Sequence, residues 1–329
     1  MGAVQAQEFA PALWGLAQRM DGGWHKDRVE GAFQEGKILR THVLRPTWHF
    51  VPALDIRWML ELTAPRIHLR MAPYNRHLEL DGRTLNRAAG VFERALRDGR
   101  FLTRSELGAR LAKAGIAANG QRLAHIAMHA ELEGVICSGP RRDRQFTYAL
   151  LAERAPRARR LDRDEALAEL TRRYVRSHGP ATVRDFVWWS GLRTADATRG
   201  LGLIGARREL IDGLTYWSCA DSAADAVRGS RAHLLPVYDE YLVAYRDREA
   251  VPHLPGALAA TGRPGGFQHA FVLRGQVAGL WRPVRNGLAV TVQVVAATRP
   301  RGAGRRALDE AAERYSAWLG APVSVSLRN

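Results

Sequence analysis

The stretch TRSELGARLAKAGIAANGQRLAHIAMHAELEGVICSGPRRDRQFTY, residues 103–148, contains the signals that decide the fold. Thr103-Arg-Ser-Glu106 precedes apolar residues at helical spacing and predicts a capping box that starts a helix. A second helix is expected from Arg122 to Glu133. The runs Val135–Cys137 and Gln145–Tyr148 then predict two strands around an arginine-rich turn. Two helices followed by a two-stranded hairpin form a winged helix.

The same order of elements is predicted downstream. Asp162-Arg-Asp-Glu165 and Thr182-Val-Arg-Asp185 each predict the start of a helix, and a further helix is expected near Thr194–Gly202. Asp212-Gly213 lies between two β-rich runs and is typical of a type I′ hairpin turn. This segment is therefore predicted to be another winged helix.

An earlier, partial copy precedes these two. Residues 9–20 and 26–35 are predicted helices, and strands are expected at 38–44 and 48–51. The first helix of this copy is missing or lies upstream of Met1, so we expect the first winged helix to be truncated.

The last hundred residues change character and indicate a small β-barrel or sheet. Glycine-bounded runs of alternating pattern predict strands at Ala270–Leu273, Gln276–Trp281 and Leu288–Val295. One helix is expected from about Gly304 to Trp318, followed by a final strand at Val323–Leu327, and the Pro/Gly-rich piece Pro252–Gly266 is a predicted loop.

The composition favours a polyanionic partner. The formal net charge is +16, and the basic residues are arginines apart from Lys26, Lys37 and Lys113. Neutralising phosphates with arginine releases counterions and drives association, although a genome rich in G and C also increases the arginine content. Cys137 and Cys219 lack the spacing of a zinc ribbon or a disulfide framework, so a reducing cytoplasm is expected. No apolar run of about 18 residues predicts a membrane span.

Three extended blocks carry a family resemblance. They are VQAQEFAPALWGLAQR (4–19), LRPTWHFVPALDIRWML (44–60) and HLLPVYDEYLVAYRDR (233–248). In this order they resemble the AlkZ-like family of winged-helix DNA glycosylases over nearly the whole chain. The resemblance implies an α+β fold with three tandem winged helices, the first truncated, and a C-terminal β-barrel. The corresponding boundaries are 1–80, 81–155, 156–228 and 229–329.

The resemblance also implies excision of alkylated purines by hydrolysis of the N-glycosidic bond. The family's catalytic pattern is a glutamine, a hydrophobic residue and a second glutamine, which Gln5-Ala6-Gln7 matches. Two neutral amides can position a water but cannot take its proton, so they suffice only where the leaving base is already good. A cationic alkylated purine leaves easily, and a normal base does not. The alternative is that Gln5 and Gln7 are ordinary polar residues flanking a helix.

Three residues outside the motif are predicted at the DNA interface. His49 would contact a phosphate or support the flipped nucleotide, and a partly buried strand histidine is the other interpretation. Asp239 and Tyr241 lie in an acidic and aromatic run. Asp239 would stabilise positive charge on the sugar or order an arginine, and structural pairing with Arg246 or Arg248 is the alternative.

The turn of the second winged helix is predicted to contact phosphates. Arg141, Arg142 and Arg144 stand at its tip, where arginine can position a duplex without reading its sequence. A solvated basic face is the alternative.

The function predicted is a DNA glycosylase for alkylated or bulky-adducted purines, working on double-stranded DNA as a cytoplasmic monomer at the nucleoid. Neither a cofactor nor a metal is expected. The alternative is a non-catalytic winged-helix regulator, for which a dimerisation element would be the expected mark.

Overall fold

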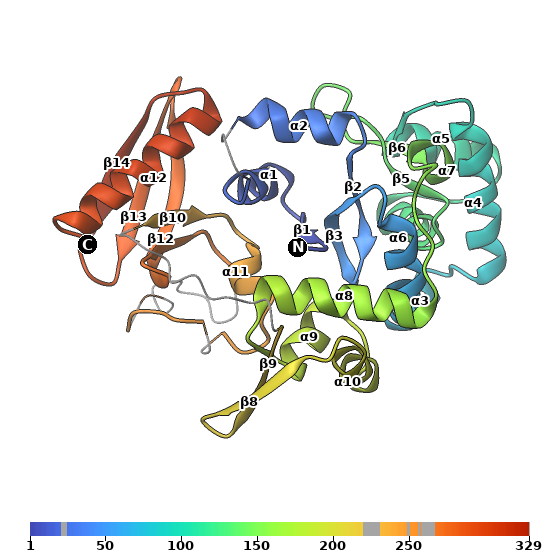
Figure 1. Cartoon of the computed structure of the whole chain (residues 1–329). Coiled ribbons are helices and arrows are strands. Elements are labelled where there is room, and N and C mark those ends of the chain that lie inside the picture. Colours follow the sequence, from blue (N-terminus) through green and yellow to red (C-terminus); the bar gives the residue numbers. More distant parts are fainter. Residues whose placement is uncertain (21–24, 220–230, 249–250, 256, 258–266, 329) are drawn as a thin grey trace. The chain divides into compact units, whose positions relative to one another are not determined.

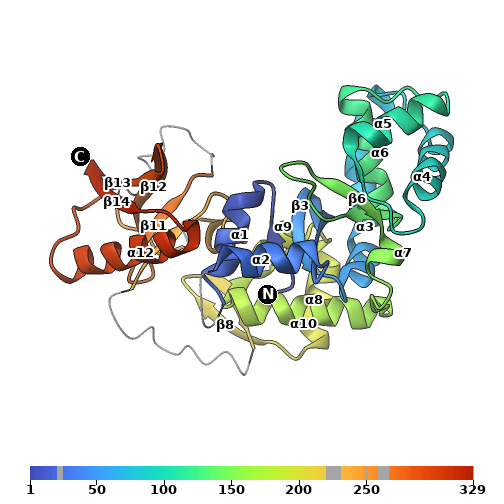
Figure 2. The ribbon, with the colours of Figure 1, turned by 90° about the horizontal axis from the view of Figure 1, so that it is seen from above.

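The computed structural model describes residues 1–20, 25–219, 231–248, 251–255, 257 and 267–328 (Figures 1 and 2). The chain divides into two compact units. The larger unit consists of Met1–Ala3 and Gly31–Cys219, and the smaller unit consists of Val4–Glu30 and Ala220–Asn329. Helix α2 (Lys26–Gln34) runs across the boundary between them.

The larger unit is a mixture of helices and short antiparallel strands. Its helices are α3 (Ile56–His77), α4 (Gly82–Leu96), α5 (Arg104–Lys113), α6 (Gly120–Leu132), α7 (Leu151–Arg154), α8 (Arg163–His178), α9 (Val183–Ser190) and α10 (Thr194–Leu203). Its strands are β2 (Ile38–Val43), β3 (Arg45–Pro52), β4 (Leu102–Thr103), β5 (Ile136–Ser138), β6 (Thr147–Leu150), β7 (Ala181–Thr182), β8 (Arg207–Ile211) and β9 (Leu214–Ser218).

One arrangement of elements occurs twice in this unit. Helices α5 and α6 lie between β4 and the hairpin β5–β6, and the three strands pair in the order β4-β6-β5. Helices α9 and α10 lie between β7 and the hairpin β8–β9, with the order β7-β9-β8. The hairpin β8–β9 projects from α9 and α10 (Figure 1). In both copies the first short strand closes a three-stranded sheet that the sequence did not indicate.

Local sequence signals fix where these elements start and turn. Thr103 and Glu106 form the expected capping box, and Asp162 with Glu165 forms another at the start of α8. Each box satisfies two backbone N–H groups that a helix start leaves without a partner. The hairpin β8–β9 turns at Asp212 and Gly213, which have φ angles of 49° and 77°. Two positive φ angles are the requirement of a type I′ turn.

Helix α3 was not predicted from the sequence. It contains Pro65 and Pro73, and a proline normally interrupts a helix because it removes one hydrogen bond and crowds the preceding turn. Burial of Trp58, Met59 and Leu62 along the first half of α3 offsets that local cost.

One hydrophobic core of the larger unit is formed by α4, α5, α6 and the strands that follow. Phe92, Leu107, Leu111, Ile126 and Ile136 are all at most 1% exposed within one apolar cluster. This cluster holds α6 and the hairpin β5–β6 in a fixed geometry, because each of these elements contributes side chains to it.

The smaller unit is an open sheet with helices. Its elements are β1 (Val4–Gln5), α1 (Phe9–Ala17), β10 (Ala232–Leu235), α11 (Glu240–Val243), β11 (Ala270–Leu273), β12 (Gln276–Asn286), β13 (Ala289–Ala296), α12 (Ala303–Leu319) and β14 (Val323–Arg328). Five strands pair in the order β10-β11-β12-β13-β14. All neighbours are antiparallel except β13 and β14, which are parallel and joined through α12.

The predicted C-terminal β-barrel is not confirmed, because the described strands leave the sheet open at β10 and β14. Helix α12 packs against β10, β11 and β14. Its Tyr315 lies edge-on to Trp14 of α1 and to Trp281 of β12, with ring centroids 5.2 Å apart in both pairs. Most of the predicted loop Pro252–Gly266 lies outside the described residues.

None of the helices in the described ranges combines the length and the apolar character needed to cross a bilayer.

Candidate active site

The motif Gln5-Ala6-Gln7 lies at the end of β1 and leads into α1. Gln5 is 6% exposed and Ala6 is 0% exposed. Gln7 is half-buried, and the neighbouring Glu8 is exposed at the N-cap position of α1. Glutamines are mostly exposed, and a buried polar side chain needs partners within the protein. Gln5 is therefore held in place by its surroundings, unlike a glutamine on the surface.

Glu240 anchors the backbone of this motif. Its Oε1 accepts a hydrogen bond from the Gln5 N–H at 2.7 Å, and its own residue is 1% exposed. A hydrogen bond to an ionised carboxylate is shorter and stronger than one between neutral groups. Gln5 is therefore positioned by a residue that lies 235 positions away in the sequence.

Asp239 orders an arginine, which is one of the two roles predicted for it. Its partner is Arg19, in the residues just after α1, through contacts of 2.6 Å and 2.8 Å to the two carboxylate oxygens. Burial alone would lower the pKa of Arg19, but the Asp239 carboxylate outweighs burial and raises it. The alternative partners Arg246 and Arg248 are not the ones that Asp239 uses. Asp239 also caps α11 by accepting the Tyr241 N–H at 2.9 Å.

The two adjacent carboxylates thus have separate structural tasks. Asp239 pairs with Arg19, and Glu240 holds the Gln5 backbone. Arg19 and Glu240 were not predicted from the sequence as parts of this group. Arg19 lies in the block 4–19 and Glu240 in the block 233–248, so membership of these two family-like blocks was the available signal.

The side chains of Tyr241 and His49 are each held by a contact within the protein. The Tyr241 hydroxyl donates to the Gly275 carbonyl oxygen at 2.5 Å, and burial raises its pKa. His49 is 0% exposed on β3, with Nδ1 2.9 Å from the Thr47 carbonyl oxygen. The interpretation of His49 as a buried strand histidine therefore agrees with its location in the larger unit.

The three arginines at the tip between β5 and β6 differ in their surroundings. Arg142 pairs with Glu106 at 2.9 Å and also donates to the Phe101 carbonyl oxygen at 2.7 Å. The guanidinium of Arg141 lies 5.3 Å from the centre of the Phe146 ring. Arg144 is exposed, and no ion pair to it occurs in the part of the chain that the structure describes. Arg144 thus has the freest side chain for a phosphate contact.

One partly buried histidine of the smaller unit is held neutral. Burial lowers the pKa of His269 to about 4. Its Nδ1 accepts the Val237 N–H at 3.1 Å, and its ring lies 4.9 Å from that of Trp281. The accepted hydrogen bond requires a lone pair on Nδ1, so the ring carries its proton on Nε2.

Comparisons with known proteins agree on one family. A family model described as DNA glycosylase AlkZ-like matches residues 1–318. An interstrand DNA cross-link repair glycosylase from Streptomyces sahachiroi is 25% identical over 308 residues, which cover 88% of this chain and 81% of that protein. The solved structure of the Streptomyces sahachiroi DNA glycosylase AlkZ superimposes with a TM-score of 0.81 at 22% identity, covering 99% of this chain and 91% of that one. The predicted α+β fold is confirmed by this match.

Proposed function

Because the chain belongs to the AlkZ-like family of DNA glycosylases, we propose that it hydrolyses the N-glycosidic bond of alkylated or bulky-adducted purines in duplex DNA. The observation that carries the proposal is the burial of Gln5 together with the hydrogen bond of its N–H to Glu240. This contact fixes the backbone that carries the two side-chain amides. Gln5 and Gln7 are the proposed catalytic residues.

The proposed mechanism depends on positioning rather than on basicity. A glutamine carbonyl accepts one hydrogen bond from a water molecule, and its NH₂ group donates two. Cleavage of a base–sugar bond develops oxocarbenium character at C1′. Two amides that fix a water against C1′ accelerate its attack by proximity and orientation. The absence of a strong base in the motif restricts the reaction to bases that leave easily, such as cationic N3- or N7-alkylated purines.

The relative from Streptomyces sahachiroi, named for repair of interstrand DNA cross-links, supports a bulky substrate. A cross-linked purine is joined to the opposite strand and does not rotate freely out of the stack, as a base must in flipping enzymes. We therefore include purines with large adducts in the proposed substrate class.

The DNA contacts are proposed to come from winged helices. The two copies of helix, helix and hairpin at 81–155 and 156–228 support this interpretation, and a first winged helix at 1–80 and a C-terminal domain at 229–329 are proposed to accompany them. Arg141, Arg142 and Arg144 are proposed to contact phosphates, and His49, Asp239 and Tyr241 to support the DNA-bound state. The protein is proposed to act as a monomer at the nucleoid.

The second candidate function is a regulator that binds DNA without catalysis. The winged-helix arrangement and the net charge of +16 serve that role equally well. A regulator that only binds DNA would have no need of the glutamine motif.

Duplex DNA containing one 7-methylguanine separates the two functions. Under single-turnover conditions the wild-type protein is expected to release the base and leave an alkali-labile abasic site. Gln7→Ala is expected to slow release roughly a hundredfold, the order of loss that follows when a reacting group is misplaced. Gln5→Ala/Gln7→Ala is expected to abolish release.

Gln293→Ala is the matched control, because Gln293 is a half-buried glutamine of β13 outside the motif. It is expected to excise at the wild-type rate. Excision by Gln7→Ala at the wild-type rate would overturn the mechanism, and DNA binding without any release by the wild type would favour the regulator.

A further inference from the structure

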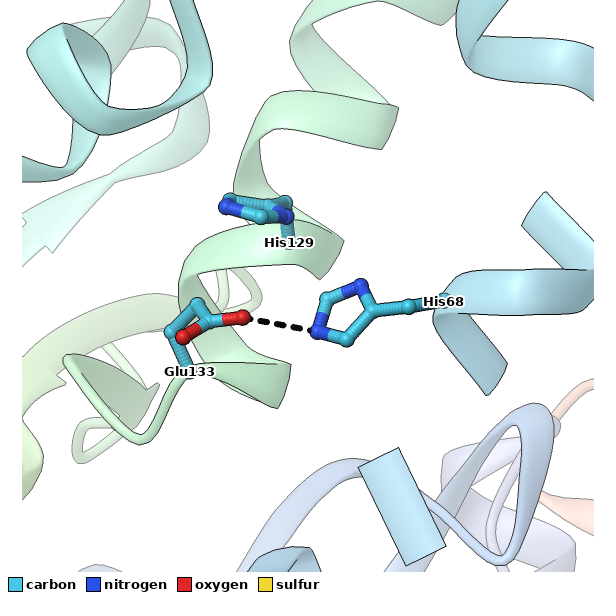
Figure 3. Close-up of side chains that lie close together, drawn as sticks. All are labelled: His68, His129 and Glu133. Carbon is cyan, nitrogen blue, oxygen red and sulfur yellow. Dashed lines mark ion pairs between the residues drawn. The ribbon is translucent and has the colours of Figure 1, made fainter. Parts of the chain in front are cut away.

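Two helices of the larger unit bring His68, His129 and Glu133 together (Figure 3). His68 is on α3, His129 is in the last turn of α6, and Glu133 is the residue that caps the end of α6. His129 and Glu133 are four positions apart, so they share one face of the helix end. One potential ligand atom from each of the three residues lies within 4.8 Å of the other two.

The polar atoms of this cluster are poorly satisfied by the protein itself. Neither ring nitrogen of His129 has a hydrogen-bond partner in the described residues, although both atoms are buried. His68 Nε2 lies 2.8 Å from Glu133 Oε1, but the contact lacks the alignment of a hydrogen bond. Buried imidazole nitrogens without partners are costly, so such a pair indicates a missing ligand.

We propose that His68, His129 and Glu133 form a binding site for a divalent cation, with Zn²⁺ as the preferred ion. Imidazole nitrogen and carboxylate oxygen are ordinary zinc ligands, at bond lengths of about 2.0–2.2 Å. Those bond lengths place neighbouring ligand atoms of a tetrahedral ion roughly 3.3 Å apart. The three side chains reach that separation by small rotations, because the His68–Glu133 contact is already at 2.8 Å and all three atoms lie within 4.8 Å.

The fourth ligand position has room for water. His68 and Glu133 line a cavity of about 260 Å³, and Arg57, Glu61 and Arg160 also line it. Arg160 is directed to Glu61 at 3.6 Å. A three-ligand site that borders such a cavity keeps one open coordination position.

The ion would connect α3 to α6. Helix α6 immediately precedes the hairpin that carries Arg141, Arg142 and Arg144. In the proposed function this tip contacts DNA, so the ion would stiffen its support. The site lies wholly within the larger unit, and its residues are not those proposed for the reaction. Loss of the metal is therefore expected to change stability rather than the chemistry of base release.

Zinc titration of the full-length protein, prepared without a histidine tag and stripped with a chelator, tests the proposal by calorimetry. One Zn²⁺ per chain is expected to bind. At about a hundredfold excess over the dissociation constant, the midpoint of thermal unfolding is expected to rise by roughly 3 °C or more. Co²⁺ is expected to give the visible absorption of a tetrahedral nitrogen and oxygen site.

His129→Gln and Glu133→Gln are each expected to weaken Zn²⁺ binding at least tenfold, by analogy with the 10–100-fold effect of losing even a supporting residue of a metal site. His77→Gln is the matched control, because His77 is an exposed histidine on the same helix as His68. It is expected to bind like the wild type.

Glu133 has a half-exposed side chain, so Glu133→Gln provides a folded variant even where His129→Gln alters packing. Absence of saturable binding in the wild type at several Zn²⁺ per chain would overturn the proposal. Equal binding by the wild type and Glu133→Gln would also overturn it. Excision of 7-methylguanine by each variant, measured separately, keeps this result independent of the proposed glycosylase function.

Discussion

At the scale of single residues, the candidate site depends on two buried carboxylates with different partners. Asp239 is 3% exposed and Glu240 is 1% exposed. A carboxylate removed from water is costly unless hydrogen bonds and an opposite charge compensate for the lost solvation. Arg19 supplies that compensation for Asp239 through two contacts, and Glu240 accepts the backbone N–H of Gln5. Glu240 is therefore a positioning residue for the catalytic motif.

Glu240→Ala is expected to slow base excision at least tenfold, equivalent to about 1.4 kcal/mol of transition-state stabilisation. The physical reason is that the Gln5 N–H loses its acceptor and the motif loses its fixed position. Glu240→Gln keeps a carbonyl oxygen for the same N–H and is expected to restore most of the rate. Single-turnover excision and thermal unfolding, measured together, separate this effect from loss of folding. An equal loss in both variants would mean that the negative charge of Glu240 is itself required.

The residues of the candidate site were predictable from the sequence only where they belong to the family motif. Gln5 and Gln7 were recognised from a short pattern, but Arg19 and Asp239 stand 220 positions apart. Nothing in local spacing relates two residues at that separation, because their contact depends on the packing of the whole smaller unit. For the same reason the sequence did not predict that His68 and His129, which lie on different helices, come close together.

At the scale of elements, the arginine tip between β5 and β6 is not uniform. Arg142 is already paired with Glu106, the residue that completes the capping box of α5. Hydrogen bonds from the Thr103 N–H and from Arg142 lower the pKa of Glu106 to about 2. Arg142 therefore serves the helix start as well as the tip, and Arg144 is the exposed arginine.

Arg144→Ala is expected to weaken binding to undamaged duplex DNA and to lower the slope of log K against log salt by about 0.9, the value for one phosphate contact. Arg142→Ala is expected to lower the slope less, because its guanidinium must leave Glu106 to reach a phosphate. Fluorescence anisotropy over a range of salt concentrations measures both slopes. Arg97→Ala, an exposed arginine of the α4 end paired with Glu93, is the control. An unchanged slope for Arg144→Ala would remove this tip from the interface.

Elements were predictable where their signals are local. Thr103, Asp162 and Thr182 each start a helix through a partner three residues later, so a short window of sequence contains the whole interaction. Helix α3 escaped prediction because Pro65 opposes helix formation locally while burial against other elements supports it. The C-terminal β-barrel stays unconfirmed, because alternating strands do not reveal whether their sheet closes or whether a helix such as α12 covers one of its faces.

At the scale of the whole molecule, the net positive charge has opposite effects on DNA binding and on the stability of the fold. The net charge of +16 strengthens association with a polyanion but also increases repulsion within the folded chain. That repulsion grows as carboxylates and histidines become protonated, so acid is expected to destabilise the protein. His269 adds a specific component to this general trend, because its pKa lies well below that of a free histidine.

The contribution of His269 has a definite sign. With a folded pKa of about 4 and an unfolded value of about 6.5, the unfolded chain binds more protons between these two pH values. The free energy of unfolding therefore falls as the pH drops from about 6.5 toward 4, by roughly 2 kcal/mol at pH 5 for this group alone. Above about pH 6.5 the residue is neutral in both states and makes no pH-dependent contribution.

His269→Asn tests this, because its carbonyl oxygen still accepts the Val237 N–H while the titrating ring is removed. The variant is expected to be less stable than the wild type at pH 7.5, since the contact with Trp281 is lost. The difference between the two proteins is expected to shrink by roughly 2 kcal/mol between pH 7 and pH 5. Urea unfolding in the presence of a chelator, at closely spaced pH values, measures it. Parallel stability curves for the two proteins over this window would show that His269 does not carry the acid sensitivity, and the carboxylates would then account for it.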